Sequence, residues 1–372
     1  MSKGKNRLNE SEDAVLARIE AFRARRPRFI DDSVTLAHGA GGKASAALID
    51  AIFFEEFGSP RPSDPGDAAT LVLQEAGEGG SASSRLAFTT DSYVVNPIIF
   101  PGGSIGDLAV NGTVNDLAVT GATPKWLSAA FVIEEGLEIS TLRQVVADMR
   151  AAADKAGVQI VAGDTKVVPK GAADKLFITT AGIGVVEEAA QLGAELVEPG
   201  DKILVSGKMG SHGMAIMLAR GNLAMSADIK SDSRSVNTLT HAVLEAAPGV
   251  RWMRDATRGG VGTVLNELAQ ATGLGVVVDD EALPVDPVAR GACDMLGIDP
   301  LYVANEGMFV AVVPAAQAGA ALEALRELEG GEDAALVGEI VTNPAGIVAV
   351  RNAFGGTRIV DMLVGDPLPR IC

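Results

Sequence analysis

Four aspartates share a local context that suits a divalent cation. Each follows an apolar segment and lies beside a turn or small residues, and they are Asp91, Asp116, Asp164 and Asp255. Carboxylates at such ends point toward a cleft, and magnesium prefers hard oxygen ligands while keeping water and phosphate oxygens in its shell. The four residues together predict a magnesium site, although each one alone could be a cap or a turn residue.

Two glycine-rich segments are candidates for binding phosphate. The first, HGAGGK at residues 38–43, precedes an expected helix, so its backbone N–H groups and its lysine favour an anion. It is neither a Walker A loop nor a Rossmann motif, and a plain helix-entry loop would explain it equally well. The second, DATRGG at residues 255–260, also opens a helix and combines a carboxylate, a hydroxyl and a guanidinium. The predicted phosphate-binding residues are His38, Gly39, Gly41, Gly42, Lys43, Thr257, Arg258, Gly259 and Gly260.

Two further residues could act on a bound substrate. Lys166 lies two residues after Asp164, within reach of the same cleft, unless it is simply an exposed lysine. Cys372 ends the sequence after two prolines and is either a free thiol on a frayed end or a thiol on a flexible arm. Residues 355–372 could span up to about 56 Å at roughly 3.3 Å per residue, enough to enter a site on the same domain or on a neighbour. Cys293, within an apolar helical segment, is expected to be core packing.

Charge and composition exclude several classes of function. The chain carries 31 Lys and Arg against 48 Asp and Glu, a formal net charge of −17. This acidity argues against nucleic acid and anionic membranes as partners. With neither a long apolar segment nor a secretory signal in the sequence, a cytoplasmic location is expected. Two cysteines and three scattered histidines leave no disulfide framework and no thiolate zinc site.

Length and turn signals divide the chain into parts. At about 150 residues per domain, 372 residues predict two domains. A turn cluster at residues 198–201 separates two halves that both mix strands and helices. The expected parts are a basic N-terminal extension (1–30), an N-terminal domain (31–190), a C-terminal domain (191–354) and a flexible tail (355–372).

The elements that must position these residues follow from hydrophobic periodicity and turn signals. Without a regular βαβ rhythm, an α+β fold is favoured over a doubly wound sheet. Helical spacing puts Asp107 half a turn from Asp116, and Asp107 is therefore expected to face solvent. Strands are expected at 86–95, 127–133, 158–162, 176–186, 202–206, 274–279, 308–313 and 347–350, and helices at 104–120, 140–156, 214–220, 234–246, 260–271, 287–296 and 315–328.

Taken together, the motifs resemble the HypE family of hydrogenase maturation factors, within the PurM-like superfamily. The resemblance runs from about Thr35 to Cys372 and leaves residues 1–30 unexplained. It rests on HGAGGK, TTDSYVVNPIIFPGGSIGDLAVNGTVNDLAVTGA, AGDTKVV, MRDATRGGVGTVLNELA, NEG at residues 305–307 and the final PRIC.

The resemblance implies a fold and an assembly that spacing alone does not reveal. It implies a PurM-like two-domain fold, in which the N-terminal sheets of two subunits pair into a central β-barrel of a homodimer. The C-terminal half is expected to be an α/β sandwich, with ATP and Mg²⁺ in the cleft between the halves. Asn111 is a candidate for contact with the adenine.

The resemblance also implies a reaction. A carbamoyltransferase, HypF, would place a carbamoyl group on Cys372, and this protein would dehydrate the thiocarboxamide to a thiocyanate with ATP. The cyanide would then pass to a HypC–HypD scaffold complex for the iron of [NiFe] hydrogenase. Phosphorylation makes the amide oxygen a leaving group, and elimination needs a base. By resemblance, Glu306 is that base and Lys166 orients or polarises the carbamoyl.

Two other readings remain open at this point. A small-molecule kinase or synthetase of the same superfamily would keep the fold and have no use for Cys372. Selenophosphate synthetase would need a reactive cysteine or selenocysteine near the first glycine loop, and no cysteine precedes Cys293. A non-catalytic scaffold would bind nucleotide without turnover.

Overall fold

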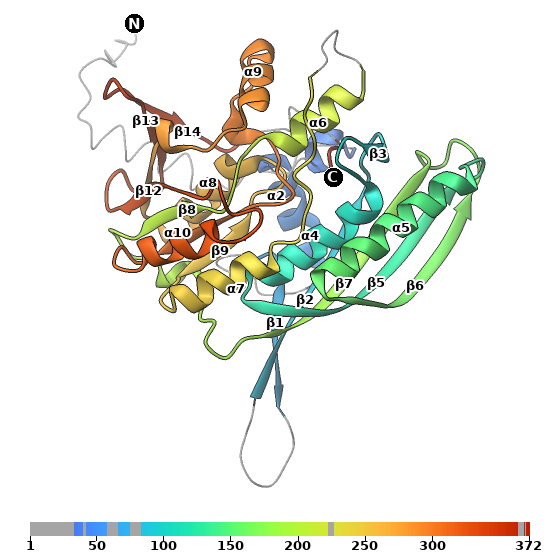
Figure 1. The fold of residues 1–372 in the computed structure, drawn as a ribbon, viewed down its shortest axis with the longest axis horizontal. Helices are drawn as coiled ribbons and strands as arrows, with labels where there is room; N and C mark the ends of the chain where they lie inside the picture. Colours follow the sequence, from blue (N-terminus) through green and yellow to red (C-terminus); the bar gives the residue numbers. More distant parts are fainter. Residues whose placement is uncertain are drawn as a thin grey trace, which may run out of the picture.

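Two sheets lie on either side of a buried helix in the computed structural model of the chain (Figure 1). The structure describes residues 33–39, 42–57, 66–74, 83–221, 227–363, 368 and 370–372. The expected basic extension and Gly41 lie outside these described residues. Within them, no helix combines the length and the apolarity that a membrane span requires.

The N-terminal half is built on a five-stranded sheet with strand order β1-β2-β7-β5-β6. Neighbouring strands are antiparallel except β5 and β6, which are parallel and are joined through helix α5 (Ile139–Ala156). A short ribbon of β3 (Ile99–Phe100) and β4 (Gly103–Ser104) lies beside it. The five strands are β1 (Ala69–Gln74), β2 (Ser83–Tyr93), β5 (Ala122–Glu134), β6 (Gln159–Val168) and β7 (Leu176–Val186).

Helix α4 (Ile105–Val119) is buried at every residue except Asp107 and Asp116. Ser104 caps its first turn, and Asp107 completes the capping box and accepts a hydrogen bond from Ser233 Oγ at 3.0 Å. The expectation that Asp107 faces solvent is therefore wrong, because its carboxylate satisfies the backbone N–H at the start of the helix. Residues of α4 pack into the cores of both halves.

The C-terminal half is a seven-stranded sheet covered by helices on both faces, with strand order β14-β13-β10-β12-β8-β11-β9. Helix α8 (Gly260–Thr272) packs against one face, and α7 (Asn237–Ala246) and α10 (Ala318–Arg326) against the other. Burial of both faces explains why the β11 sequence is apolar throughout. The strands are β8 (Lys202–Val205), β9 (Trp252–Asp255), β10 (Gly275–Asp279), β11 (Phe309–Val313), β12 (Ala335–Val341), β13 (Val348–Arg351) and β14 (Thr357–Val360).

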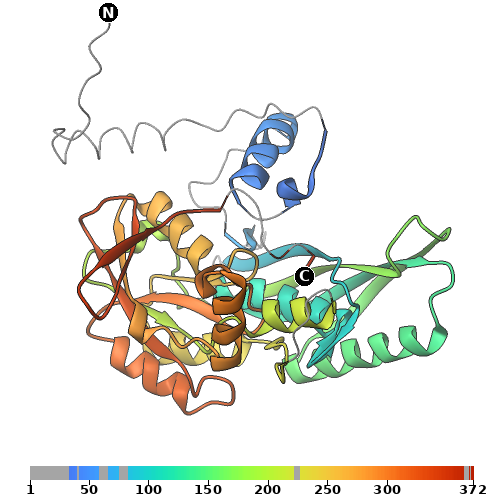
Figure 2. The same ribbon diagram turned by 90° about the horizontal axis from the view of Figure 1, so that it is seen from above.

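The remaining elements lie around the junction of the two halves. Figure 2 shows the N-terminal helical segment, drawn in blue, on the outside of this junction. Helices α6 (Ser211–Ala219) and α9 (Pro287–Leu296) contribute to the same apolar core as the ribbon and α4. The short segments are η2 (Leu36–Gly39), α2 (Lys43–Leu48), η3 (Ile49–Phe54), α3 (Glu55–Phe57), η4 (Ala194–Leu196), η5 (Asp280–Ala282) and η6 (Pro300–Tyr302).

The prediction of an α+β fold is confirmed, and several element bounds are close to those expected. Strand β7 and helix α9 have the predicted limits, and Gly157 ends α5 in a left-handed conformation. The helix expected at 140–156 begins one residue earlier, at Ile139, and Glu138 occupies its N-cap. Strands β1, β9, β12 and β14 were not predicted, and β14 lies within the expected flexible tail, paired with β13.

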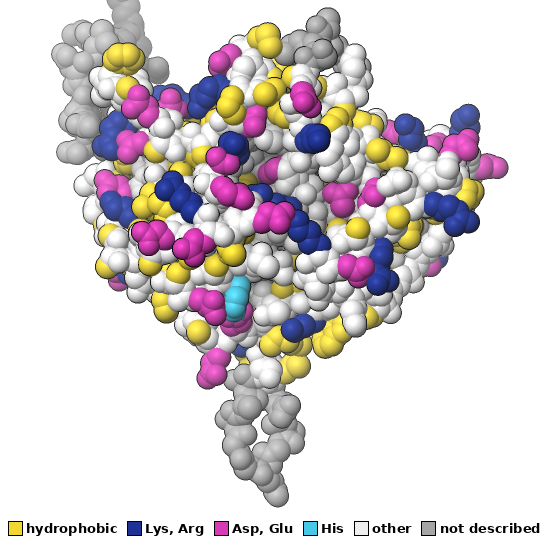
Figure 3. All heavy atoms as spheres, viewed as in Figure 1, with side chains coloured by type: hydrophobic (Ala, Val, Ile, Leu, Met, Phe, Trp, Pro, Cys, Tyr) yellow, Lys and Arg dark blue, Asp and Glu magenta, His cyan; other side chains and the backbone are white. Residues whose placement is uncertain are grey.

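The face of the molecule that carries α5, α7 and α10 has acidic and basic side chains interspersed (Figure 3). One such pair joins Arg150 to Asp154 along α5 at 2.7 Å. Exposed pairs of this kind contribute little to stability. The buried apolar cores around α4 must therefore supply most of it.

Close packing of α4 against α5 can be tested at Gly106. A Cβ there would lie 2.1 Å from the carbonyl oxygen of Val145, so an alanine must push the helices apart. We expect Gly106→Ala to lower the free energy of unfolding by roughly 1–3 kcal/mol in chemical denaturation. Gly291→Ala in α9 is the matched control, since a Cβ there meets nothing within 4 Å. It should be neutral or stabilising by up to about 1 kcal/mol. Equal stability of the two variants would contradict this packing.

Candidate functional site

Five carboxylates from both halves of the chain lie close together, and the charges of their neighbours raise the pKa of three of them, Asp116, Asp255 and Glu306. Asp67 precedes β1, Asp91 lies in β2 and Asp116 lies in α4, whereas Asp255 ends β9 and Glu306 precedes β11. Three of the four predicted metal ligands are therefore together. Sequence analysis missed Asp67, although it too lies beside a glycine at the start of an apolar strand. We call these five residues the carboxylate cluster.

Burial is the main reason that the cluster titrates abnormally. It raises the pKa of Asp116 well above the usual value, and Asp255, Asp67 and Asp91 add repulsion. The pKa values of Asp255 and Glu306 are raised in the same way, first by burial and then by neighbouring carboxylates. The guanidinium of Arg258 acts in the opposite direction on both Asp91 and Glu306. An uncompensated charge at such a site is costly, so the cluster favours protons or cations.

Local partners compensate only part of this charge. Arg254 reaches Asp67 at 3.3 Å and Glu267 at 2.7 Å. Thr89 Oγ1 lies 2.8 Å from Asp116 Oδ2 and 2.9 Å from the carbonyl oxygen of Asp67. Because one hydroxyl proton serves one acceptor, a protonated Asp116 would allow both contacts to form at once.

Two buried oxygens of the cluster are orphaned. Asp255 Oδ2 and Glu306 Oε1 accept no hydrogen bond from the described residues. Such oxygens fit a bound cation, as magnesium requires hard anionic ligands. Among the described residues, however, no three His, Cys, Asp or Glu side chains are arranged to hold a metal by themselves. A metal here would need further oxygen ligands, which water and phosphate supply.

The second glycine loop borders the cluster and has no room for larger residues. Gly259 and Gly260 have φ of 76° and 58°. A Cβ on Gly259 would lie 2.2 Å from Thr263 Oγ1, and one on Gly260 would lie 2.5 Å from the carbonyl oxygen of Leu301. The carbonyl oxygen of Thr257 accepts a hydrogen bond from the Gly260 backbone N–H at 2.9 Å, so the loop turns tightly into α8 shortly after Asp255. This geometry suits an anion held between Arg258 and the start of a helix.

The first glycine loop is tied into the structure through other contacts. His38 Nδ1 is bonded by the Thr35 backbone N–H at 2.9 Å, and Arg258 donates to the carbonyl oxygen of Gly39 at 2.8 Å. The two glycine loops are thus neighbours. Gly42 is the N-cap of α2, and the ammonium of Lys43 pairs with Asp361 at 3.2 Å. Lys43 therefore neutralises a carboxylate in addition to any role toward an anion.

Asp164 and Lys166 lie on the opposite face of the five-stranded sheet from Asp91. Asp91 pairs with Thr180, which faces α4, whereas Asp164 is in register with Ala130 and Thr179 on the open face. A bulge at Leu127/Ser128 in the pairing of β5 with β6 shifts the register by one residue and sets this face. Both side chains are exposed, and hydrogen bonding from Lys166 lowers the pKa of Asp164.

Glu306 is held through its backbone. The carboxylate of Asp232 accepts from the backbone N–H groups of Glu306 at 3.1 Å and Gly307 at 3.2 Å. Asn115 in α4 donates to the carbonyl oxygen of Glu306 at 3.3 Å. Asn111, one turn earlier, donates to Ser233 at 3.0 Å. The NEG motif is therefore braced against α4, while the Glu306 carboxylate stays turned toward the cluster.

Cys372 lies beside the end of β2. The backbone N–H of Val94 donates to the carbonyl oxygen of Cys372 at 3.2 Å. Val94 follows Asp91 by three residues, so about 10 Å of strand separates the two backbones. Tyr93, between them, is fully buried, and its pKa is raised by burial and by Asp91, Asp116 and Glu306. The last residue is therefore held at the end of the strand that carries Asp91, with its side chain against the apolar core that contains Tyr93.

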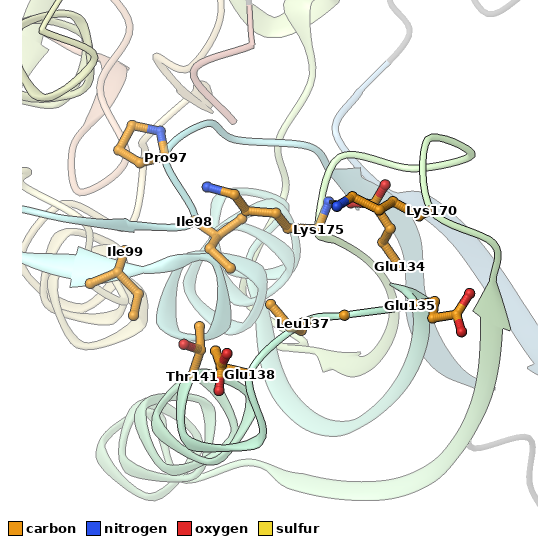
Figure 4. A pocket seen from close by; sticks show the side chains of 11 residues that line it. Pro97, Ile98, Ile99, Glu134, Glu135, Leu137, Glu138, Thr141, Lys170 and Lys175 are labelled. Atoms are coloured by element: carbon orange, nitrogen blue, oxygen red, sulfur yellow. Dashed lines mark hydrogen bonds between the residues drawn. The ribbon is translucent and has the colours of Figure 1, made fainter.

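A cavity of about 410 Å³ lies away from the carboxylate cluster, near the open ends of β5 and β7 (Figure 4). Pro97, Ile98 and Leu137 form part of its wall, and Lys170 and Lys175 flank it. None of the predicted site residues lines it. The candidate site therefore rests on the convergence of charged groups and not on this cavity.

Comparison with known proteins supplies the family. Residues 66–186 match the AIR synthase related protein N-terminal domain, and residues 198–351 match the corresponding C-terminal domain. The chain is 53% identical over 342 residues to the carbamoyl dehydratase HypE of Rhodobacter capsulatus, covering 92% of this chain and 99% of the relative. The chain belongs to the HypE family.

Solved HypE structures agree with this assignment. A HypE–HypF complex has 42% identity and a TM-score of 0.79, covering 85% of this chain and all of the solved chain. A HypE structure in complex with ATP has 45% identity and a TM-score of 0.74, covering 91% and 100%. The expected PurM-like fold is confirmed. Among the described residues, the N-terminal sheet is open and does not close into a barrel by itself.

Asp116→Asn tests the repulsion within the carboxylate cluster. The amide keeps an acceptor for Thr89 and removes one charge. Because the folded-state pKa of Asp116 is raised, stability falls as pH rises from about 4 through that pKa. We expect the metal-free variant to unfold roughly 2–4 °C above the wild type at pH 8, with a smaller difference at pH 5. Differential scanning calorimetry at both pH values measures this.

Asp294→Asn is the matched control. Asp294 is an exposed aspartate of α9, outside the cluster, and its replacement should leave the unfolding temperature unchanged at both pH values. A lower unfolding temperature for Asp116→Asn at pH 8 would contradict the proposed repulsion.

Proposed function

We propose that this chain catalyses the ATP-dependent dehydration of a carbamoyl group on the thiol of Cys372, turning a thiocarboxamide into a thiocyanate. The product would supply cyanide ligands for the iron of [NiFe] hydrogenase. The observation that carries the proposal is the position of Cys372 beside the end of β2, the strand that carries Asp91 of the carboxylate cluster. Relatives described as carbamoyl dehydratases, and one solved in complex with ATP, support it.

The proposed reaction balances without a redox partner. The thiocarboxamide and ATP give the thiocyanate, ADP and phosphate. The carbamoyl oxygen leaves in the phosphate, both amide protons are lost, and the carbon–nitrogen bond becomes triple. The protein must therefore bind the polyphosphate, exclude water and accept protons.

The cluster and the glycine loops provide the binding parts of such a site. Asp67, Asp91, Asp116 and Asp255 would hold Mg²⁺, and Arg258 and the loop at Gly259 would face the phosphates. Magnesium–ATP supplies an activated phosphoryl group with its charge spread over the metal. Binding of the cations would also relieve the repulsion that raises the cluster's pKa values.

Glu306 is the proposed base for the elimination. Burial raises its pKa, which makes its carboxylate a stronger base than a solvated glutamate. Its Oε1 accepts no hydrogen bond from the described residues and is thus available to take a proton. As a base it must be ionised, so the rate should fall as pH drops through its raised pKa.

Intact mass spectrometry tests the role of Cys372. After incubation with carbamoyl phosphate, ATP and HypF, we expect the wild type to gain the mass of one carbamoyl group. Further incubation with magnesium and ATP should then remove one water. Cys372→Ala should show neither change, because the accepting sulfur is absent. Cys293→Ala, the control at a buried thiol, should behave as wild type. ATP consumption with a small metabolite and no adduct would contradict the proposal.

A homodimer built on the open face of the five-stranded sheet is the proposed assembly, with the two sheets forming a barrel. Several large apolar side chains on this face are exposed, between 37% for Val185 and 53% for Leu71. Soluble proteins rarely expose a continuous apolar patch of this kind. The patch contains Leu71, Leu73, Phe88, Trp126 and Val185.

Asp164 and Lys166 belong to the same open face. Since they lie across the sheet from Asp91, their proposed roles as metal ligand and carbamoyl-orienting group require that another copy approach this face. In a dimer, Lys166 of one subunit would serve the Glu306 of the other. The active site would then be shared.

Subunit complementation tests the shared site. Lys166→Ala and Glu306→Gln should each bind ATP but lose dehydration. Mixing the two variants under subunit exchange should restore about a quarter of wild-type activity, because half of the dimers are mixed and each holds one complete site. A mixture of Lys166→Ala with the double variant Lys166→Ala/Glu306→Gln is the control and should stay inactive. No recovery in exchanged mixed dimers would contradict the shared site.

Partner proteins would load the thiol and accept the product. HypF is proposed to load Cys372, as a solved HypE–HypF complex of relatives suggests, and a HypC–HypD complex to accept the cyanide. The reaction is proposed to take place in the cytoplasm. The proposed domains are 31–190 and 191–354, which the two family matches support, preceded by residues 1–30 and followed by the tail at 355–372.

A further inference from the structure

The end of the chain is docked in an extended conformation. The backbone N–H of Val94 donates to the carbonyl oxygen of Cys372 at 3.2 Å, and that of Asn96 donates to the carbonyl oxygen of Arg370 at 3.3 Å. This two-residue spacing is that of antiparallel pairing. Ile371 is 1% exposed and packs into the core that α4 and α6 share. Residues 370–372 are therefore a seated segment of the fold.

Two side chains bind the main chain of the same segment: His212, in α6, and Arg220, the C-cap of α6. His212 Nε2 lies 2.6 Å from the carbonyl oxygen of Ile371. Arg220 donates to the carbonyl oxygen of Arg370 at 2.5 Å and to that of Asn96 at 2.8 Å. With the Val94 contact, each of the last three carbonyl oxygens accepts a hydrogen bond. Recognition of carbonyls does not depend on the tail's side chains.

The partners of His212 determine its tautomer. A carbonyl oxygen only accepts, so Nε2 must carry the proton that points at Ile371. Burial lowers the pKa of His212, which keeps the ring neutral and leaves Nδ1 as an acceptor for the Ser231 hydroxyl at 2.8 Å. His212 is thereby fixed between the tail and the segment that begins at Ser231.

The segment that begins at Ser231 also holds Glu306, the proposed base. Asp232, next to Ser231, accepts from the backbone N–H groups of Glu306 and Gly307. Ser231 Oγ in turn accepts from the Ser233 N–H at 3.0 Å. A short chain of bonds therefore leads from the carbonyl of Ile371 through His212 and Ser231 to the NEG motif.

We propose that His212 and Arg220 are positioning residues that form a latch on the main chain of the tail. The latch holds Cys372 at the end of β2, the strand that carries Asp91, and keeps it in a fixed relation to Glu306. Opening these contacts would free the half-buried Cys372 for an enzyme that modifies its thiol. The catalytic consequence rests on the proposed function, whereas the latch itself does not.

Hydrogen exchange and thiol alkylation of the full chain test the latch directly. In Arg220→Ala, we expect the amides of Val94 and Asn96 to exchange about tenfold faster, since a charged hydrogen bond on the segment is lost. Alkylation of Cys372 by iodoacetamide should rise by a similar factor, and Cys293, which is fully buried, serves as the internal reference. Arg150→Ala, an exposed arginine of α5, is the control and should match the wild type. Unchanged exchange and alkylation in Arg220→Ala would overturn the latch.

Two substitutions of His212 distinguish its hydrogen bond to the tail from its packing. His212→Phe keeps a ring against Phe100 and removes the donor, whereas His212→Gln keeps a donor near the position of Nε2. We expect fast alkylation of Cys372 in the first and near wild-type alkylation in the second. Equal alkylation in both would overturn the role of His212, and Arg220→Ala remains decisive if the phenylalanine variant does not fold.

Dehydration of the loaded protein tests the positioning role of Arg220. In Arg220→Ala already loaded with a carbamoyl group, dehydration should slow about tenfold while the affinity for ATP stays unchanged. A freed tail with undiminished dehydration would overturn the positioning role. If the loaded wild type itself does not dehydrate, the proposed function fails, and the exchange and alkylation results still decide whether the latch exists.

Discussion

Burial of helix α4 between the two sheets is the constraint on which the rest of the structure depends. Its apolar residues contribute to the cores of both halves, so the halves cannot separate without exposing them. Its polar residues are then committed to particular partners, because a buried polar group without one is costly. Asp107 caps the helix and bonds Ser233, Asn115 braces Glu306, and Asp116 faces the cluster.

The carboxylate cluster lowers the stability of the fold that holds it. Buried carboxylates that raise one another's pKa are destabilising in the absence of protons or cations, and Arg254 and Arg258 offset only part of the repulsion. A frame stable enough to hold them can bind metal-complexed phosphate without reorganising, and such preorganisation is what phosphoryl transfer needs. The orphaned oxygens of Asp255 and Glu306 are consistent with that use.

Two surfaces link this centre to other molecules. The open face of the five-stranded sheet carries Asp164, Lys166 and exposed apolar side chains, so its chemistry depends on what covers it. The tail, in contrast, is held within the same chain through its carbonyls, by His212, Arg220 and Val94. In the proposed mechanism, a modified thiol would move between a loading partner and a seat beside the cluster while the cluster stays in place.

The sequence by itself determined the α+β class, most of the long elements and the residue types of the site, because periodicity, caps and turns act locally. It identified Asp91, Asp116, Asp255 and Glu306 through motifs, but it missed Asp67, which joins them only through long-range packing. The face of Asp164 was decided by tertiary structure, since one bulged residue in β6 reverses every later side chain of the strand. The position of Cys372 could not be predicted from the sequence either. Every residue has a carbonyl group, and only the fold places His212 and Arg220 against those of the tail.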